Sequence, residues 1–195
     1  MKEKLLGLLD IVKNNKKNLI KVAVALVVVI IVITVLSTIF SAKPKKYEEK
    51  IKTFTKALSS ESKMKDAIEK YVDLRGAAAF QEADLDYKDL KKEYKKMKKD
   101  ADEVDDMEKA LKAYAKESED SDISVSVSKI GKPKQNSKNK KIYTVSATMS
   151  LKSSYGSISD QSVRFVFYKG KIIDILSKGY GDDSSMFKNA LDSNK

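Results

Sequence analysis

The sequence predicts an α+β protein in which a single transmembrane helix precedes N-terminal helices packed on a four-stranded antiparallel sheet. Three observations lead to this fold class. Residues 19–40 are almost wholly apolar, apolar residues between Tyr47 and Lys116 follow the helical repeat, and from Ile123 onward apolar residues alternate with serine and threonine. Because the helices come first and the strands follow, we expect them to segregate as they do in α+β domains.

The apolar segment Leu19–Phe40, LIKVAVALVVVIIVITVLSTIF, has the length of a membrane span. Its twenty-two residues include one charge, Lys21, and about twenty residues at roughly 1.5 Å each cross a hydrocarbon core of about 30 Å. A cleaved signal peptide has a shorter apolar region of about 7–15 residues and small residues before the cut, where a cut after Ala42 would place Phe40. We therefore expect an uncleaved signal anchor over 19–41, with membrane lipid as the partner of Leu19–Phe40.

The lysines around this segment do not settle its orientation, because six lie on either side. The first six are Lys2, Lys4, Lys13, Lys16, Lys17 and Lys21, and the second six are Lys43, Lys45, Lys46, Lys50, Lys52 and Lys56. A long domain after an N-terminal anchor is usually exported whatever its charge. This predicts a single-pass protein of the cell membrane with a cytoplasmic N-terminus and an extracytoplasmic C-terminal domain.

The predicted divisions are a basic cytoplasmic tail at 1–18, the transmembrane helix at 19–41, a linker at 42–46 and the extracytoplasmic α+β domain at 47–195. The leucines of the tail recur at helical spacing among lysines. The tail is therefore either a short amphipathic helix on an anionic leaflet or a disordered segment that carries orientation charge.

Helical stripes of apolar residues fill the first half of the predicted exterior domain. Tyr47–Leu58 carries the first stripe, and a second runs from Met64 and ends near Gly76, so this part is either one bent helix or two. A third helix is predicted over Leu85–Met97. The fourth runs over Asp102–Lys116 and begins with acidic residues, which suit the positive end of a helix dipole. The tyrosines of these stripes are expected in the core.

Alternation of apolar and hydroxyl side chains predicts four strands in the second half. They are expected over Ile123–Val127, Tyr143–Leu151, Val163–Phe167 and Lys171–Ser177. Their connections are too short for parallel crossovers, so the sheet is expected to be an antiparallel meander. Lys169–Gly170 is predicted as its tightest turn.

Loops are predicted at Lys129–Lys141 and Lys152–Asp160, and a short helix near the C-terminus. Asp182–Asp183 are expected to cap that helix, which contains Met186 and Phe187. The helices are expected on one face of the sheet. The other face, rich in serine and threonine on the first two strands, is expected to be solvated or to form a shallow cavity.

The order of these elements resembles that of the cystatin/NTF2-like domains exported by Gram-positive bacteria. The resemblance rests on the strand KIYTVSATMSL after a Lys/Asn loop and on SVRFVFYKGKIIDI with its turn, and it covers Tyr47–Tyr180. It implies helices against a curved sheet, in a family that includes non-enzymatic scaffolds, ligand-binding cones and a few enzymes. A membrane-anchored subset, similar to VirB8-type components of conjugation and secretion machines, shares the order of tail, span and exterior domain. No residue matches a catalytic position of the family, so none is carried over.

Composition excludes several kinds of site. The 195 residues contain no His, Cys or Trp, which removes the commonest general base and metal ligand and all thiolate chemistry. No phosphate-binding glycine loop or nucleophile elbow is present, and the acidic run Asp100–Asp106 lacks the spacing of a Ca²⁺ loop. We therefore predict no catalytic residue, no metal site and no cofactor, and a protein that is not an enzyme.

The net charge of +11 favours anionic partners. Arginine recognises phosphates and bases in planar geometry, and Arg75 and Arg164 are the two arginines present, so specific nucleic-acid recognition is not expected. The loop Lys129–Lys141 carries six lysines and no acid, namely Lys129, Lys132, Lys134, Lys138, Lys140 and Lys141. It is predicted either as a contact for an anionic wall polymer or lipid, or as a solvated hairpin loop whose charges discourage edge pairing.

Three functions are compatible with these observations. The leading one is a single-pass, membrane-anchored extracytoplasmic binding or scaffolding module that acts through protein–protein or envelope contacts. The second is a VirB8-like structural component of a conjugation or secretion assembly. The third is an NTF2-like small-ligand binder or enzyme that uses a cavity on the sheet, and rings of Tyr143, Phe165 and Phe167 filling that cavity would speak against it.

Overall fold

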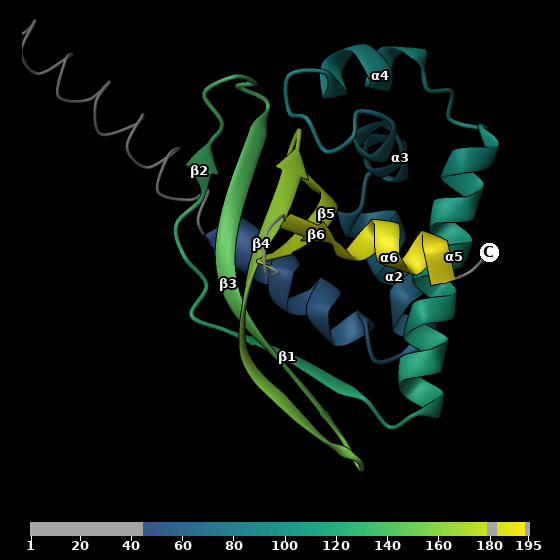
Figure 1. Cartoon of the computed structure of the whole chain (residues 1–195), viewed down its shortest axis with the longest axis vertical. Helices are drawn as coiled ribbons and strands as arrows, with labels where there is room; N and C mark the ends of the chain where they lie inside the picture. Colours follow the sequence, from purple (N-terminus) through teal and green to yellow (C-terminus); the bar gives the residue numbers. More distant parts are fainter. Residues whose placement is uncertain (1–44, 179–182, 194–195) are drawn as a thin grey trace, which may run out of the picture. The chain divides into compact units, whose positions relative to one another are not determined.

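The structure of the chain is a computed structural model that describes residues 45–178 and 183–193. Helices come first: residues 45–57 are helical, followed by α2 (Glu61–Tyr71), α3 (Leu74–Glu82), α4 (Leu90–Lys96) and α5 (Asp102–Asp120). The strands are β1 (Ser124–Ser128), β2 (Lys134–Gln135), β3 (Ile142–Ser153), β4 (Gly156–Tyr168), β5 (Lys171–Lys178) and β6 (Asp183–Ser185). The helix α6 (Met186–Ser193) ends the described part (Figure 1).

All these strands belong to one antiparallel sheet with the order β1-β3-β4-β5-β6, and β2 pairs with β3 along the same edge as β1. The longest pairing is β3 with β4, from Ile142 opposite Tyr168 to Ser153 opposite Gly156. The turn between β4 and β5 is Lys169–Gly170, where both residues have positive φ, 51° and 83°. Two-residue turns of this kind match the twist of the strands, and the predicted turn is confirmed.

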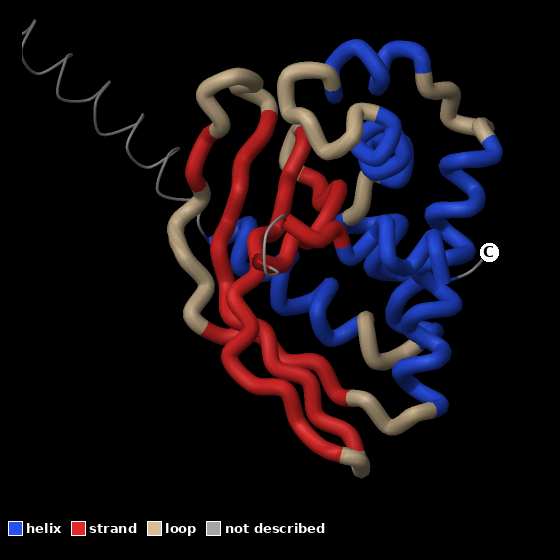
Figure 2. The backbone as a smooth tube through the Cα atoms, viewed as in Figure 1, coloured by secondary structure: helices blue, strands red, loops and turns tan. Residues whose placement is uncertain are grey.

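The helices pack against the sheet, and the apolar core lies between them (Figure 2). The predicted stripe of the first helix is buried, since Ile51, Phe54 and Leu58 are fully covered. Phe54 contacts Phe187 of α6, with 6.0 Å between the ring centroids. Full burial of one such side chain contributes about 1.5–3 kcal/mol, so these contacts join the two ends of the described chain firmly.

The strand β5 is covered on both faces. Asp174, Ile175 and Leu176 are successive strand residues and are at most 3% exposed, although their side chains point alternately to opposite faces. The helix α3 covers part of this strand closely, because a Cβ atom placed on Gly76 would lie 2.7 Å from Cγ2 of Ile173. The expectation that helices cover one face of the sheet is therefore wrong for β5.

The far ends of β3 and β4 form a hairpin arm, which we define as residues 149–161. Among the described residues, β4 pairs with β5 from Val163 onward, and the part of β4 within the arm pairs with β3 alone. A register shift between Met149 and Leu151 marks a β-bulge, where Asp160 of the opposite strand has a φ of 56°. Figure 1 shows the arm at the lower end of the view with β1 beside it.

The sheet has six strands, so the predicted count of four is wrong. The strands β2 and β6 have two and three residues, which are too few to show an alternating pattern. The predicted loop at Lys152–Asp160 is also wrong, because β3 continues to Ser153 and β4 begins at Gly156. Serine and glycine are typical of loops, but cross-strand pairing makes this stretch part of the sheet.

Three helix boundaries differ from those predicted. Asp73 accepts a hydrogen bond from N of Gly76 at 3.0 Å and so caps α3, which places Gly76 inside a helix. The third helix is shorter than predicted, because Leu85 has a φ of 61° and cannot continue a right-handed helix. The cap of α6 is Ser185, whose Oγ accepts a hydrogen bond from N of Lys188 at 2.9 Å; the cap was predicted at Asp182–Asp183, of which Asp182 lies outside the described residues.

The membrane part of the predicted fold class is corrected by the structure. Across residues 45–178 and 183–193, no helix is both long and apolar enough to cross a membrane. The longest, α5, has nineteen residues but carries acidic and basic side chains along most of its length. The predictions of a transmembrane helix, a signal anchor and a single-pass membrane localisation are therefore not supported. The segment 19–41, on which they rest, lies outside the described residues.

Candidate functional site

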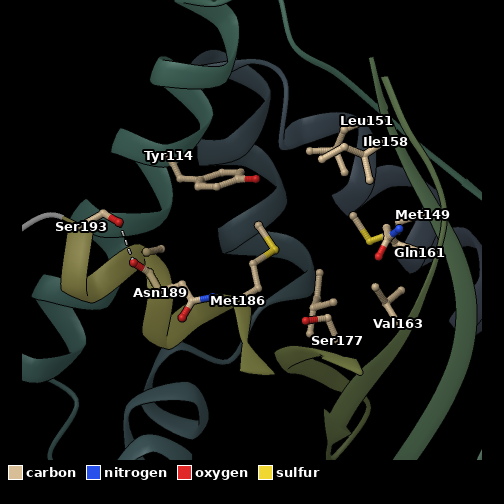
Figure 3. Close-up of a pocket in the computed structure, with 12 residues that line it drawn as sticks. Tyr114, Met149, Leu151, Ile158, Gln161, Val163, Ser177, Met186, Asn189 and Ser193 are labelled. Carbon is tan, nitrogen blue, oxygen red and sulfur yellow. Dashed lines mark hydrogen bonds between the residues drawn. The ribbon is translucent and has the colours of Figure 1, made fainter. Parts of the chain in front are cut away.

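An apolar pocket of about 330 Å³ lies between the sheet, α5 and α6 (Figure 3). Its lining residues are Tyr114 of α5, Met149 and Leu151 of β3, Ile158, Gln161 and Val163 of β4, Ile175 and Ser177 of β5, and Met186, Asn189, Ala190 and Ser193 of α6. Figure 3 shows the Met186 side chain pointing between Tyr114 on one side and Met149 on the other. The volume is at the lower end of the range of roughly 300–1,000 Å³ that is typical of ligand sites.

Aromatic rings fill the sheet on the side of this pocket nearer the β4–β5 turn. Phe167 meets Tyr47 edge-on with 4.6 Å between ring centroids, and Tyr47 lies 5.8 Å from Tyr143. Phe165 is fully buried. The rings of Tyr143, Phe165 and Phe167, which were expected to fill any cavity on this part of the sheet, are thus packed against other side chains. The pocket opens beyond these rings, toward the arm.

The helix α6, which supplies four lining residues, is held at its N-terminus by a buried carboxyl group. Oδ1 of Asp174 accepts hydrogen bonds from N of Ile175 at 2.7 Å and from N of Phe187 at 3.3 Å. Oδ2 accepts from Oγ of Ser185 at 2.7 Å and from Nε2 of Gln81 at 3.0 Å. A carboxyl group at a helix N-terminus satisfies free N–H groups and interacts favourably with the helix dipole. This network therefore ties one wall of the pocket to β5 and α3.

Burial raises the pKa of Asp174 from 3.8 to about 6, and its hydrogen bonds to Ser185, Ile175, Gln81 and Phe187 act in the opposite direction. The residue is 0% exposed, and a charged carboxylate loses its hydration when it is enclosed. Asp174 and Ile175 are neighbours in β5, so their side chains point to opposite faces of the sheet. Ile175 lines the pocket and Asp174 does not. We therefore assign Asp174 to the support of α6 and not to contact with a ligand.

The lining of the pocket offers little for acid–base chemistry. None of its twelve residues is Asp, Glu, Lys or Arg. Burial raises the pKa of the Tyr114 hydroxyl, the charge of Glu117 adds to the rise, and a hydrogen bond with Ser118 opposes it, so this group stays neutral near pH 7. The polar groups within reach are amides and hydroxyls, and Oγ of Ser193 donates to O of Asn189 at 2.9 Å (Figure 3). The pocket suits an apolar group that a few hydrogen bonds orient.

The rim of the pocket lies on the arm. Ile158 is 56% exposed and Tyr155 at the tip is 95% exposed, and these are the exposed large apolar side chains of the described chain. Ile158 and Gln161 both line the pocket, although residues three apart in a regular strand point to opposite faces. The bulge at Asp160 adds one residue between them and so brings both to the same face.

The six lysines predicted to contact an anionic partner are spread along the β1–β2 edge of the sheet and the β2–β3 loop. Nζ of Lys129 lies 3.7 Å from Oδ1 of Asp160 on the arm, Lys132 lies between β1 and β2, and Lys134 is on β2. Lys138, Lys140 and Lys141 lie in the β2–β3 loop, next to the segment that precedes α4. None of the six lines the apolar pocket. The first lysine of the predicted site is therefore beside the arm, and the last three are beside the segment that precedes α4.

Sequence patterns did not reveal the pocket. Tyr114 belongs to a stripe that was predicted as core, Ile158 falls in a predicted loop, and Met186 lies in a helix too short to show a clear face. Four of the five elements that line the pocket supply only one to three residues each. One local feature of the sequence did point to the pocket. Tyr155 and Ile158 are large apolar residues within a serine-rich stretch, and a loop that only faces solvent has no need of large apolar side chains.

The acidic run Asp100–Asp106 opens α5 and shows no metal site. Asp102, Glu103 and Asp105 occupy the first turn of that helix, where negative charge is favourable. Within the part of the chain that the structure describes, no group of three or more acidic residues is placed to hold a metal ion.

No protein-family model matches the chain, and no curated protein or solved structure matches it either. The resemblance to cystatin/NTF2-like domains, with its VirB8-like subset, therefore stays a prediction from the sequence. Function has to be inferred from the pocket and from the surfaces around it.

Proposed function

We propose that this chain is a non-enzymatic binding module that works through protein–protein contacts, and that its pocket receives an apolar side chain of the partner. The observation that carries this proposal is the pocket of about 330 Å³ with the exposed Ile158 at its rim. Exposed apolar side chains beside a concave apolar surface are typical of contact sites. The lack of charged groups in the lining supports binding over acid–base catalysis.

An extended segment is the form of partner that this site favours. Residues 156–162 of β4 have a strand neighbour on one side only within the described structure. A peptide can add to such an edge by main-chain hydrogen bonds, while alternate side chains enter neighbouring pockets. Because Ile158 and Gln161 belong to this edge and also line the pocket, one partner strand could use both.

The test is photo-crosslinking in cells that produce the full chain with the photoreactive residue p-benzoyl-phenylalanine in place of Ile158. We expect a discrete protein adduct, and we expect Gln161→Trp to abolish it because the indole would fill the pocket from an exposed position of β4. Ser162→Trp is the matched control, since Ser162 is also exposed and its side chain points to the other face of the strand. This control should leave the adduct unchanged.

Two results would overturn the proposal. An adduct that persists with Gln161→Trp would mean that the partner does not use the pocket. The absence of any protein adduct at position 158, together with a small apolar molecule that copurifies with the wild-type chain and is lost with Gln161→Trp, would replace protein binding by small-ligand binding. The volume of the pocket makes that second function the one to compare.

A further inference from the structure

A second surface, separate from the pocket, gathers nine exposed lysines at the end of the domain formed by α4, the β2–β3 loop and the β4–β5 turn. They are Lys88, Lys91, Lys92, Lys95, Lys96, Lys138, Lys140, Lys141 and Lys169. We call this surface the basic pole, and it lies at the top of Figure 1. It shares no residue with the apolar pocket.

Specific contacts hold the three segments of the basic pole together. Nδ2 of Asn139 in the β2–β3 loop donates to O of Tyr87 at 3.2 Å, just before α4. N of Lys169 donates to O of Lys141 at 3.0 Å. The ammonium group of Lys169 lies 4.2 Å from the ring centroid of Tyr94 in α4. The lysines are therefore brought together by the fold and not merely by their abundance in the sequence.

Acidic groups offset only part of this charge. The connection before α4 and α4 itself contain four carboxylates, Asp84, Asp86, Asp89 and Glu93. Oε1 of Glu93 lies 3.0 Å from Nζ of Lys96 and 3.8 Å from Nζ of Lys92. The Arg75 guanidinium lies 4.5 Å from the centroid of the Tyr94 ring, and the Asp73 carboxylate raises the pKa of the same tyrosine. Because both charges are near Tyr94 and are opposite in sign, together they add no net charge to the surface. Nine ammonium groups against four carboxylates leave a positive surface.

Lys88 and the four lysines of α4 also surround a hollow. Its lining consists of Lys88, Lys91, Lys92, Lys95 and Lys96. Residues three and four apart are neighbours on a helix surface, so the four lysines of α4 lie on one side of that helix. A row of phosphate groups in this hollow would meet several ammonium groups at once.

We propose that the basic pole binds a linear phosphate polymer that carries no bases. Lysine ammonium groups attract phosphates as point charges without the planar recognition that arginine provides, which suits a uniform anionic chain. Single-stranded nucleic acid binding normally adds aromatic side chains on which bases stack. At the basic pole the ring of Tyr94 is covered by Lys169 and Arg75, and the exposed large apolar side chains of the described chain lie on the arm.

An anionic membrane surface fits less well for a related reason. Peripheral membrane binding combines basic residues with apolar side chains that enter the interface. The lining of the hollow is entirely lysine. A free polymer can follow the surface without such insertion, and counterion release supplies the driving force.

The test measures binding of long-chain inorganic polyphosphate to the full chain at several salt concentrations. The pole variant carries Lys91→Gln, Lys95→Gln and Lys140→Gln. The control variant carries Lys116→Gln, Lys129→Gln and Lys132→Gln, which remove the same charge from exposed positions outside the pole. We expect the pole variant to bind about tenfold more weakly or worse and its log–log salt dependence to become shallower by about 2, and the control to stay close to wild type.

Four results would overturn the proposal. Equal weakening in both variants would mean that net charge alone attracts the polymer, and no binding of polyphosphate at low salt would remove the surface as a site. Single-stranded DNA of the same total charge that bound as tightly, and lost affinity in the pole variant, would make this a nucleic-acid surface. Tighter binding to phosphatidylglycerol vesicles with the same variant dependence would make it a membrane surface. These results do not depend on the apolar pocket, so they leave the proposed function unaffected.

Discussion

At the scale of single residues, Asp174 links the fold to the candidate site. Its carboxyl group lies at the start of α6 and accepts four hydrogen bonds, two of them from N–H groups of Ile175 and Phe187. Removing one of these partners would leave a buried polar atom unsatisfied, which costs about 1–3 kcal/mol. The position of the α6 wall of the pocket therefore depends on a group that does not itself line the pocket.

The raised pKa of Asp174 makes the free energy of unfolding depend on pH. The pKa in the folded chain, about 6, is above the ordinary 3.8, so between these values the folded chain binds more protons than the unfolded chain. Stability from this group is therefore full below about pH 4 and falls as the pH rises to about 6. A tenfold change in proton affinity corresponds to about 1.4 kcal/mol, so the fall is on the order of 3 kcal/mol.

The variant Asp174→Asn keeps an acceptor oxygen but cannot ionise, so it should not show this fall. Urea unfolding between about pH 4 and pH 7 should show the wild type losing stability relative to Asp174→Asn as the pH rises. Asp66→Asn on the exposed face of α2 is the control, and it should follow the wild-type profile. A constant difference between wild type and Asp174→Asn over the whole range would show that Asp174 does not titrate there.

At the scale of secondary-structure elements, α3 packs closely on β5 at Gly76. Glycine is the poorest helix former after proline, by about 1 kcal/mol relative to alanine, yet Gly76 lies within α3. A Cβ atom at this position would lie 2.7 Å from Cγ2 of Ile173, which is fully buried and cannot move aside. Close approach of the helix thus outweighs helix propensity.

The variant Gly76→Ala should destabilise the chain by about 1–2 kcal/mol, because overpacking of about 1–3 kcal/mol exceeds the gain in helix propensity. Ile173→Leu keeps the volume but removes the β-branch, so Gly76→Ala should cost less in that background. Urea unfolding of the two single variants and the double variant measures the coupling. Stabilisation by Gly76→Ala in the wild-type background would contradict the close contact.

The sequence predicted those elements whose local pattern agrees with their packing. Serine or threonine alternates with apolar residues through β1 and most of β3, and α5 shows a regular stripe, so these elements were predicted. The strands β2 and β6 have two and three residues, and their pairing is decided by neighbours distant in the chain. Residues 152–160 were predicted as a loop because serine is frequent there, whereas pairing between the ends of β3 and β4 makes all of them except the turn at 154–155 part of the sheet.

The candidate site was less predictable than the fold for the same reason. The pocket joins Tyr114 to residues as distant as Ser193, so no short window of sequence contains it. For the lysine loop, the sequence located exposed charge correctly. Only the contact of Asn139 with Tyr87 shows that the second half of that loop lies beside the segment that precedes α4, and only the ion pair with Asp160 shows that Lys129 lies beside the arm.

At the scale of the whole described domain, two surfaces of different chemistry lie on one buried core. The apolar pocket lies beside the arm, and the basic pole lies around α4, toward the other end of Figure 1. They share no lining residue, so substitutions in one should leave the other unchanged, as is usual for sites without common partners. The proposed function requires that the pocket of the folded chain is accessible to an apolar group.

Access to the pocket is tested by methyl NMR of the full chain labelled at its six methionines. The probe is the neutral apolar fluorophore N-phenyl-1-naphthylamine. Met149 and Met186 line the pocket, whereas Met64 and Met107 are fully buried elsewhere in the core. We expect the probe to shift the methyl signals of Met149 and Met186 and to leave those of Met64 and Met107 in place, and we expect Gln161→Trp to abolish the shifts. If the signals of Met149 and Met186 do not respond, or if all four methionines shift equally, the pocket does not admit the apolar probe specifically.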